Sequence, residues 1–224
     1  RFVVEGAKTV LELLDSDYTT EVVLGTPAFF EQLRSRSNAF SGEVIEVKPE
    51  VLATLGEYRT NDGALAIAKC KPNVKPVLTA SDLALVLDDI RDPGNLGTII
   101  RIADWYGIRA VIASDETAEL YNPKVLHSSK GSFTRIPVYY TNLPEFLSTS
   151  ALPVYGTFLS GEDVHRVNFG SGGLIAIGNE AHGISQAVEQ FVTKKISIPR
   201  YGNAESLNAG VATAVICDNI RRSR

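Results

Sequence analysis

Hydrophobic residues in the first 70 positions are spaced alternately as in helices and as in strands. Residues 7–14 place Ala7, Val10, Leu11 and Leu14 on one face of a helix. Short apolar or β-branched runs between such segments are typical of strands. The expected helices span residues 5–14, 27–34 and 49–55, and the expected strands span residues 21–24, 44–47 and 64–68. This alternation predicts a small α/β domain over residues 1–70.

A segment containing two prolines and two lysines, residues 71–76, interrupts this pattern. Proline removes a backbone donor and breaks regular elements, so this segment cannot continue a buried helix or strand. We interpret it as a solvated linker that its prolines make semi-stiff.

From residue 77 onwards the apolar runs become longer and more continuous. The run from Leu83 to Leu87 contains no polar residue, as expected for a parallel strand covered on both faces. The expected strands span residues 83–87, 110–113, 136–140, 154–159, 174–177 and 196–198, and the expected helices span residues 96–106, 123–130, 143–150 and 185–192. A last helix opens at Glu205 and is apolar on nearly every side as far as Cys217, which predicts that it is buried. Residues 77–224 are therefore expected to form a second α/β domain around a parallel sheet.

Three junctions in this second part run from an apolar strand into a polar turn and then a helix. Their turns lie at residues 88–95, 178–183 and 199–208. Ligands of open α/β sheets bind beyond the carboxyl ends of the strands, so these turns predict one composite site. Capping of a helix start is the structural alternative for Asn203, Ser206 and Asn208, but one cap accounts for only one of them.

The composition fits a globular protein of one large or two small domains. The chain has 224 residues, of which 44% are hydrophobic and 21% are charged, with a mean hydropathy of +0.03. No apolar run approaches the roughly 20 residues of a membrane span. The first five residues lack the long apolar core of a signal peptide. We therefore expect a cytoplasmic protein without a membrane association.

Cysteine and histidine are too few and too scattered to predict a metal site. Cys70 and Cys217 are the two cysteines, and we interpret both as core thiols in a reducing compartment. A zinc site needs about four ligands, which the three histidines and two cysteines do not supply in any recognisable spacing.

The net charge of −4 and the isoelectric point of about 5.5 argue against strong, sequence-independent binding to nucleic acid along the whole surface. A local basic patch remains compatible with this average.

Three stretches resemble the motifs of a known family: DPGNLGTIIRIAD from Asp92, LIAIGNEAHGIS from Leu174 and ISIPRYGNAESLNAGVATAV from Ile196. In this order they are similar to the motifs of the SpoU (TrmH) branch of the SPOUT methyltransferases, which methylate ribose 2′-oxygens of RNA with S-adenosyl-L-methionine. The resemblance covers residues 83–220, and residues 1–70 more weakly resemble the family's small substrate-binding domain. It implies a C-terminal SPOUT-type knotted parallel-sheet methyltransferase domain, with a trefoil knot, behind a small N-terminal α/β domain.

The resemblance also implies which residues act in catalysis: Arg101, Asn95, Glu180, Ser206 and Asn208. Arg101 would clamp a phosphate beside the 2′-hydroxyl, or serve as the base that some accounts assign to it. A guanidinium with a pKa above ~12 is better suited to stabilising charge than to accepting a proton. The alternatives are a surface ion pair of Arg101 with Asp104 or Asp92, turn chemistry for Asn95, a charge at a helix start for Glu180, and capping for Ser206 and Asn208.

The same resemblance implies that the donor binds mainly through backbone atoms at Gly178, Ile198 and Leu207, with Thr157 as a further wall residue. Core packing is the alternative for Ile198 and Leu207. The GxGxxG fingerprint of a conventional dinucleotide site does not follow the first strand of this part.

The sequence thus predicts a 2′-O-methyltransferase of structured RNA, with ribosomal RNA preferred and transfer RNA left open. The family implies a homodimer. One rival is a non-catalytic RNA-binding protein on the same fold, which the complete motif set disfavours. Another is an unrelated small-molecule α/β enzyme, which the absent dinucleotide fingerprint disfavours.

Overall fold

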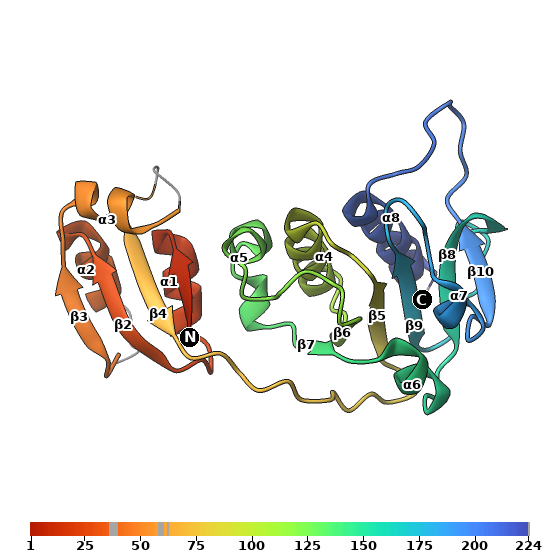
Figure 1. Ribbon diagram of the computed structural model, residues 1–224, viewed down its shortest axis with the longest axis horizontal. Coiled ribbons are helices and arrows are strands. Elements are labelled where there is room, and N and C mark those ends of the chain that lie inside the picture. Colours follow the sequence, from red (N-terminus) through yellow and green to blue (C-terminus); the bar gives the residue numbers. More distant parts are fainter. Residues whose placement is uncertain (36–39, 58–60, 62, 224) are drawn as a thin grey trace.

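The structure is a computed structural model that describes residues 1–35, 40–57, 61 and 63–223. Its elements form two sheets, each with its own helices, joined by an extended segment that crosses the lower edge of the view (Figure 1). The expected α/β class is confirmed, with a largely parallel sheet in the C-terminal part.

The N-terminal part is a four-stranded sheet in the order β1-β4-β2-β3. Its strands are β1 (Phe2–Glu5), β2 (Thr20–Gly25), β3 (Glu43–Glu46) and β4 (Ala64–Ala68), and its helices are α1 (Ala7–Leu14), α2 (Pro27–Arg34) and α3 (Pro49–Leu55). β2 and β3 are parallel, whereas β4 runs antiparallel to both β1 and β2. The three expected helices are present, and α2 and α3 have the expected bounds. α1 begins at Ala7 rather than at Glu5, because Glu5 ends β1 and Gly6, with φ of 93°, precedes the helix. β1 is an additional strand that was not predicted.

The C-terminal part is a six-stranded sheet in the order β10-β8-β9-β5-β6-β7, in which every neighbouring pair is parallel. Its strands are β5 (Leu83–Asp88), β6 (Ala110–Ala113), β7 (Val138–Tyr140), β8 (Val154–Asp163), β9 (Gly173–Gly178) and β10 (Lys194–Ser197). Its helices are α4 (Pro93–Trp105), α5 (Pro123–Ser129), α6 (Leu143–Ser148), α7 (Gln186–Glu189) and α8 (Ala209–Arg222), with a 3₁₀ turn, η1 (Ser132–Thr134). All six residues of β5 are buried, as a parallel strand covered on both faces requires.

The strand order brings two of the three polar turns together. β6 pairs with one side of β5 and β9 with the other, and Asp88 at the end of β5 aligns with Gly178 at the end of β9. The loops after β5 and β9 therefore emerge side by side at the carboxyl edge of the sheet. This is the position where open α/β sheets place ligands.

The last helix differs from its prediction in both its start and its burial. α8 begins at Ala209 rather than at Glu205, because the side chain of Asn208 caps the helix at that point. One face of α8 is buried, but Val211 is 52% exposed, so the expectation of a helix buried all round is wrong.

Two further expectations need adjustment. Cys70 is exposed, so only Cys217 is a core thiol, and burial raises the pKa of the Cys217 thiol to about 12. Residues 71–76 form neither helix nor strand, and Lys71 and Asn73 are bound to the parts on either side, to Asp17 in one part and to Tyr121 and Tyr140 in the other. In the described part of the chain, no helix is long and apolar enough to cross a membrane.

Candidate functional site

The turn between β5 and α4 is held by its own carboxylates. The side chain of Asp92 accepts the backbone N–H of Asn95 at 2.8 Å and so caps α4, with Pro93 in the first turn. Lys124 of α5 donates to the other carboxylate oxygen at 3.0 Å. The Lys124 hydrogen bond, followed by the Asn95 backbone N–H, holds the pKa of Asp92 below its usual range. This cap fixes Asn95 in the first turn of α4.

The turn after β9 is a compact loop closed by two backbone hydrogen bonds between Asn179 and Gly183, of 3.1 and 2.9 Å. The side chain of Asn179 donates to the carbonyl of Asp89 at 2.8 Å and accepts the N–H of Ala181 at 2.8 Å. It therefore ties this loop to the turn after β5 while shaping the loop that carries Glu180.

Gly178, immediately before this loop, has no room for a side chain. A Cβ at this position would lie 2.1 Å from the carbonyl carbon of Gly183 and 2.2 Å from the nitrogen of Ile184. Both are backbone atoms and cannot move aside without moving the loop, so glycine is required by close packing rather than by an unusual backbone angle.

The third turn delivers Asn208 to the same place. Its side-chain oxygen accepts the N–H groups of Gly210 and Val211 at 2.9 and 3.2 Å, which is a helix cap. Its side-chain nitrogen remains available for a different partner. Capping and a role in the site are therefore not alternatives for Asn208, since the two ends of its amide serve both.

Residues of all three motifs meet in one chain of hydrogen bonds. Asn208 donates from Nδ2 to Oδ1 of Asn95 at 2.7 Å, and Asn95 donates from Nδ2 to Oε1 of Glu180 at 2.5 Å. The chain runs from the amino end of α8 to an exposed carboxylate. The side-chain amide of Asn95 thus holds one oxygen of the Glu180 carboxylate in place.

Two of the expected catalytic residues lie outside this chain. Arg101 is exposed on α4, six residues beyond Asn95 and on a different face of the helix. Its suggested ion-pair partners are engaged elsewhere, Asp104 with Arg135 and Asp92 with Lys124. Ser206 is exposed in the loop before α8.

The structural alternatives, capping for Ser206 and core packing for Leu207, do not explain the two residues that precede Asn208 in this loop. Ser206 does not cap α8, because Asn208 does. Leu207 is 49% exposed and so does not pack in the core.

The remaining expected donor-binding residues lie near the ends of neighbouring strands. Gly156 of β8 pairs with Ala176 of β9, so Thr157 lies where β8 approaches the end of β9. From there β8 leaves its regular pairing with β10, which resumes at Glu162. Ile198, just after β10, is half-buried and packs against the main core. Its side chain therefore makes core contacts in addition to its expected place in the donor pocket.

The sequence analysis did not single out three residues that hold the site together, namely Asn179, Asp89 and Lys124. Asn179 lies in the second motif, between Gly178 and Glu180. From the sequence alone, an asparagine that only forms a turn cannot be distinguished from one that also bonds to another loop. Asp89 adopts a left-handed backbone, with φ of 61°. Among the described residues, no group of three or more His, Cys, Asp or Glu side chains is arranged to hold a metal ion.

Comparison with known proteins identifies both parts of the chain. Residues 82–218 match the model of the SpoU rRNA Methylase family, and residues 1–66 match that of the MRM3-like substrate binding domain. The chain is 31% identical over 228 aligned residues to the 23S rRNA (guanosine(2553)-2′-O)-methyltransferase RlmP of Bacillus subtilis, covering 97% of this chain and 91% of that protein. It is 28% identical to the 23S rRNA (uridine(2479)-2′-O)-methyltransferase of Streptomyces viridochromogenes, covering 99% of this chain and 83% of that protein.

Solved structures agree along the whole chain. The SpoU methyltransferase AviRb from Streptomyces viridochromogenes, in complex with AdoMet, superposes with a TM-score of 0.87 at 28% identity, covering 100% of this chain and 90% of that one. An AdoMet-bound rRNA methyltransferase from Sinorhizobium meliloti gives a TM-score of 0.85 at 28% identity, covering 99% of this chain and 87% of that one. The family match spans well over half of the chain, and the protein belongs to the SpoU rRNA methylase family.

Proposed function

We propose that this RNA methyltransferase transfers the methyl group of S-adenosylmethionine to the 2′-oxygen of a ribose in ribosomal RNA. The observation that carries the proposal is the hydrogen-bond chain from Asn208 through Asn95 to Glu180, which joins all three motifs at the carboxyl edge of the parallel sheet. The relatives from Bacillus subtilis and Streptomyces viridochromogenes are both named for 2′-O-methylation of 23S rRNA, which supports ribosomal over transfer RNA.

The residues expected to hold the donor suit its chemistry. S-adenosylmethionine supplies an electrophilic methyl group on a sulfonium centre. An adenosine pocket needs apolar walls and a few exposed backbone groups. Ile198 and Leu207 offer partly exposed apolar side chains, Thr157 is half-buried, and Gly178 lets the two ends of the loop after β9 lie in direct contact.

Within this site we assign different tasks to the two charged residues. Glu180, oriented by Asn95, would accept a hydrogen bond from the target ribose and hold its hydroxyl in line with the methyl group. Arg101 would pair with an RNA phosphate through its planar guanidinium and stabilise charge developing on the 2′-oxygen. Ser206, exposed in the loop that leads to Asn208, would contact the RNA phosphate or the donor's methionine end.

We also infer that the protein acts as a homodimer through the outer face of α4 and α8. These helices pack directly against each other, and a Cβ at Gly210 of α8 would lie 3.0 Å from Cγ2 of Thr98 of α4. Trp105 on α4 is 83% exposed, which is unusual for a tryptophan on a monomer surface. Arg101 precedes Trp105 by about one helical turn on the same exposed side, so this interface would border the site.

The domain organisation follows the same proposal. Residues 1–70 would recognise RNA, residues 71–76 would link, and residues 77–224 would carry the methyltransferase site in the cytoplasm. The trefoil knot implied by the family resemblance belongs to this last part.

The direct test combines donor binding with methyl transfer. We expect the wild-type protein to bind S-adenosylmethionine in calorimetry and to transfer labelled methyl groups to ribosomal RNA. The methylated ribosomal RNA should resist alkaline cleavage at one position. Transfer to transfer RNA alone would reassign the substrate. Absence of donor binding by folded protein would refute the enzymatic proposal and leave a non-catalytic RNA-binding role.

A further inference from the structure

The two parts of the molecule share one continuous apolar core rather than meeting at a solvated joint. Phe2 of β1 packs against Tyr121 and Phe133 of the C-terminal part, with ring centroids 4.5 and 6.0 Å apart. Tyr18 lies edge-on to the same two rings, at 6.4 and 5.8 Å. Phe2 and Phe133 are almost completely buried, so separating the parts would expose large aromatic surfaces to water.

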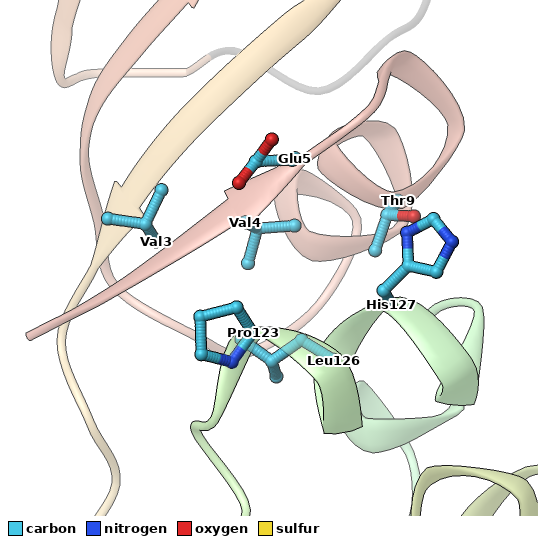
Figure 2. A pocket seen from close by; sticks show the side chains of 7 residues that line it. All are labelled: Val3, Val4, Glu5, Thr9, Pro123, Leu126 and His127. Carbon is cyan, nitrogen blue, oxygen red and sulfur yellow. The ribbon is translucent and has the colours of Figure 1, made fainter. Parts of the chain in front are cut away.

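The contact continues between β1 and α1 on one side and α5 on the other. Figure 2 shows Pro123 and Leu126 of α5 facing Val4 of β1, with His127 beside Thr9 of α1. A hollow remains between these side chains, and polar and apolar side chains of both parts form its walls. It lies away from the three strand-end loops, so we assign it no ligand and interpret it as the rim of the contact.

One arginine bridges the two parts across this contact. Arg135 donates from Nη1 to Glu12 of α1 at 2.9 Å, and from Nε and Nη2 to Asp104 of α4 at 2.9 and 2.8 Å. Gly131, with φ of 93°, leaves room for the Glu12 side chain beside Arg135, since a Cβ at Gly131 would lie 2.0 Å from a Glu12 carboxylate oxygen. The planar fork of arginine suits two carboxylates at once, and lysine could not reproduce this geometry.

The linker is fastened as well. The backbone N–H of Lys71 donates to the hydroxyl of Tyr121 at 2.8 Å, and its ammonium pairs with Asp17. The side chain of Asn73 donates to the carbonyl of Tyr140 at 2.7 Å and accepts its N–H at 2.9 Å. Tyr140 belongs to β7, the outer strand of the sheet. The side chain of Asn73 therefore makes the hydrogen bonds to the backbone of Tyr140 that a neighbouring strand would otherwise make.

We propose that Arg135 and Asn73 are positioning residues that hold the N-terminal domain in one orientation on the methyltransferase domain. The RNA-recognition surface of the N-terminal domain and the methyltransferase site then belong to one rigid body and lie at a fixed distance from each other. An RNA that contacts both would be selected by the distance between its recognition element and its target ribose. The proposal rests on the proposed function only for this RNA consequence, because the docking itself can be measured without RNA.

The first experiment measures docking directly. Hydrogen exchange is followed in β1, α1 and α5 of the full chain for wild type, Asn73→Ala, Arg135→Gln and the double variant. Loss of one charge-assisted hydrogen bond weakens a contact by about tenfold in its equilibrium constant, so exchange at these amides should rise by about that factor in Arg135→Gln and further in the double variant. Small-angle scattering of the double variant should show a wider distribution of molecular dimensions. Arg34→Gln, on the exposed side of α2, removes the same positive charge without touching the contact and should match wild type.

The second experiment separates positioning from chemistry. We expect the double variant to bind S-adenosylmethionine as wild type does and to keep kcat at saturating RNA, while KM for RNA rises about tenfold. Should Arg135→Gln fail to fold, Glu12→Gln removes the same bridge and leaves the Asp104 pair intact. Unchanged exchange and scattering in the double variant would overturn the proposal, as would a fall in kcat without a change in KM. A wild-type protein that methylates no RNA would refute the proposed function, whereas the exchange result would still decide the docking.

Discussion

The side-chain amide of Asn95 lies between Glu180 and Asn208, donating to Glu180 at 2.5 Å and accepting from Asn208 at 2.7 Å. The polarity of this chain is fixed at its far end, because Asn208 turns its oxygen towards the N–H groups of α8 and so must turn its nitrogen towards Asn95. Asn95 must then face Glu180 with its own nitrogen. The helix cap thus determines the orientation of a carboxylate that belongs to a different loop.

Replacing Asn95 by aspartate should reverse the last step of this chain. Asn95→Asp places an oxygen against the Glu180 carboxylate, so that two negative groups repel each other where a donor stood. We expect methyl transfer to fall by about 10²-fold, which is the effect of losing one well-placed polar group in an active site. Single-turnover transfer on ribosomal RNA measures it.

Asn142→Asp is the matched control for this change. Asn142 caps α6 through its side-chain oxygen, and aspartate caps equally well. It should retain full activity. Equal loss in both variants would mean that Asn95 has no special part in the site.

Arg101 offers a second test of the assignments. Because it lies outside the hydrogen-bond chain and is exposed, Arg101→Ala should leave folding and donor affinity unchanged while methyl transfer falls by about 10²-fold or more. Arg101→Lys keeps the charge but loses the planar fork. A lysine variant close to wild type would show that a point charge suffices, and reduced donor binding in Arg101→Ala would contradict a role towards RNA.

Gly178 tests whether the packing of the strand ends matters for donor binding. In Gly178→Ala the added methyl meets the backbone of Gly183 and Ile184, so the loop carrying Glu180 must shift. We expect a loss of about 1–3 kcal/mol in the free energy of unfolding, together with weaker S-adenosylmethionine binding in calorimetry. Gly202→Ala, which meets nothing within 4 Å in the adjacent loop, should leave both quantities unchanged.

The sequence allowed the site to be predicted to the extent that its geometry is local. The covered strand β5 follows from neighbouring residues and was predicted. The start of α4 was expected at Leu96, three residues too late, although Asp92 and Pro93 are by type a suitable cap and a suitable first-turn residue. The start of α8 was not predictable, because Ser206 and Asn208 are equally suitable caps by type and only the tertiary contact with Asn95 favours the second.

The contact between the two parts could not be read from the chain for a similar reason. Asn73 stands between prolines in a segment with every mark of a solvated linker, and Arg135 has the appearance of an exposed basic residue. Their partners, Tyr140, Glu12 and Asp104, lie from 31 to 123 positions away in the sequence. Side-chain pairing over such distances has no periodic signature, unlike the burial of a helix face.

Oligomerisation provides a fourth test. If the outer face of α4 and α8 forms the proposed dimer, Trp105→Glu places a charge in an apolar interface and should yield a monomer in light scattering. Val77→Glu introduces the same charge at an equally exposed apolar residue of the extended segment before β5, and it should remain dimeric. A wild-type protein that is already monomeric and active would contradict the proposed dimer.

The acid side of the stability profile should report on the cap of α4. The folded protein holds the pKa of Asp92 below its ordinary value of 3.8, first through Lys124 and then through the N–H of Asn95. A depressed carboxyl pKa contributes stability above the unfolded value, and this contribution is lost as the pH falls through the folded value. Asp92→Asn keeps a capping oxygen but removes the ion pair, whose side chains are about half exposed and therefore screened by solvent. Urea unfolding should show a loss of about 0.5–1 kcal/mol at pH 7 that shrinks towards zero at an acid pH below the folded pKa of Asp92, where the wild-type carboxyl is itself protonated. Lys124→Gln should reproduce the loss at pH 7. A deficit of equal size at both pH values would place the effect in the cap rather than in the charge.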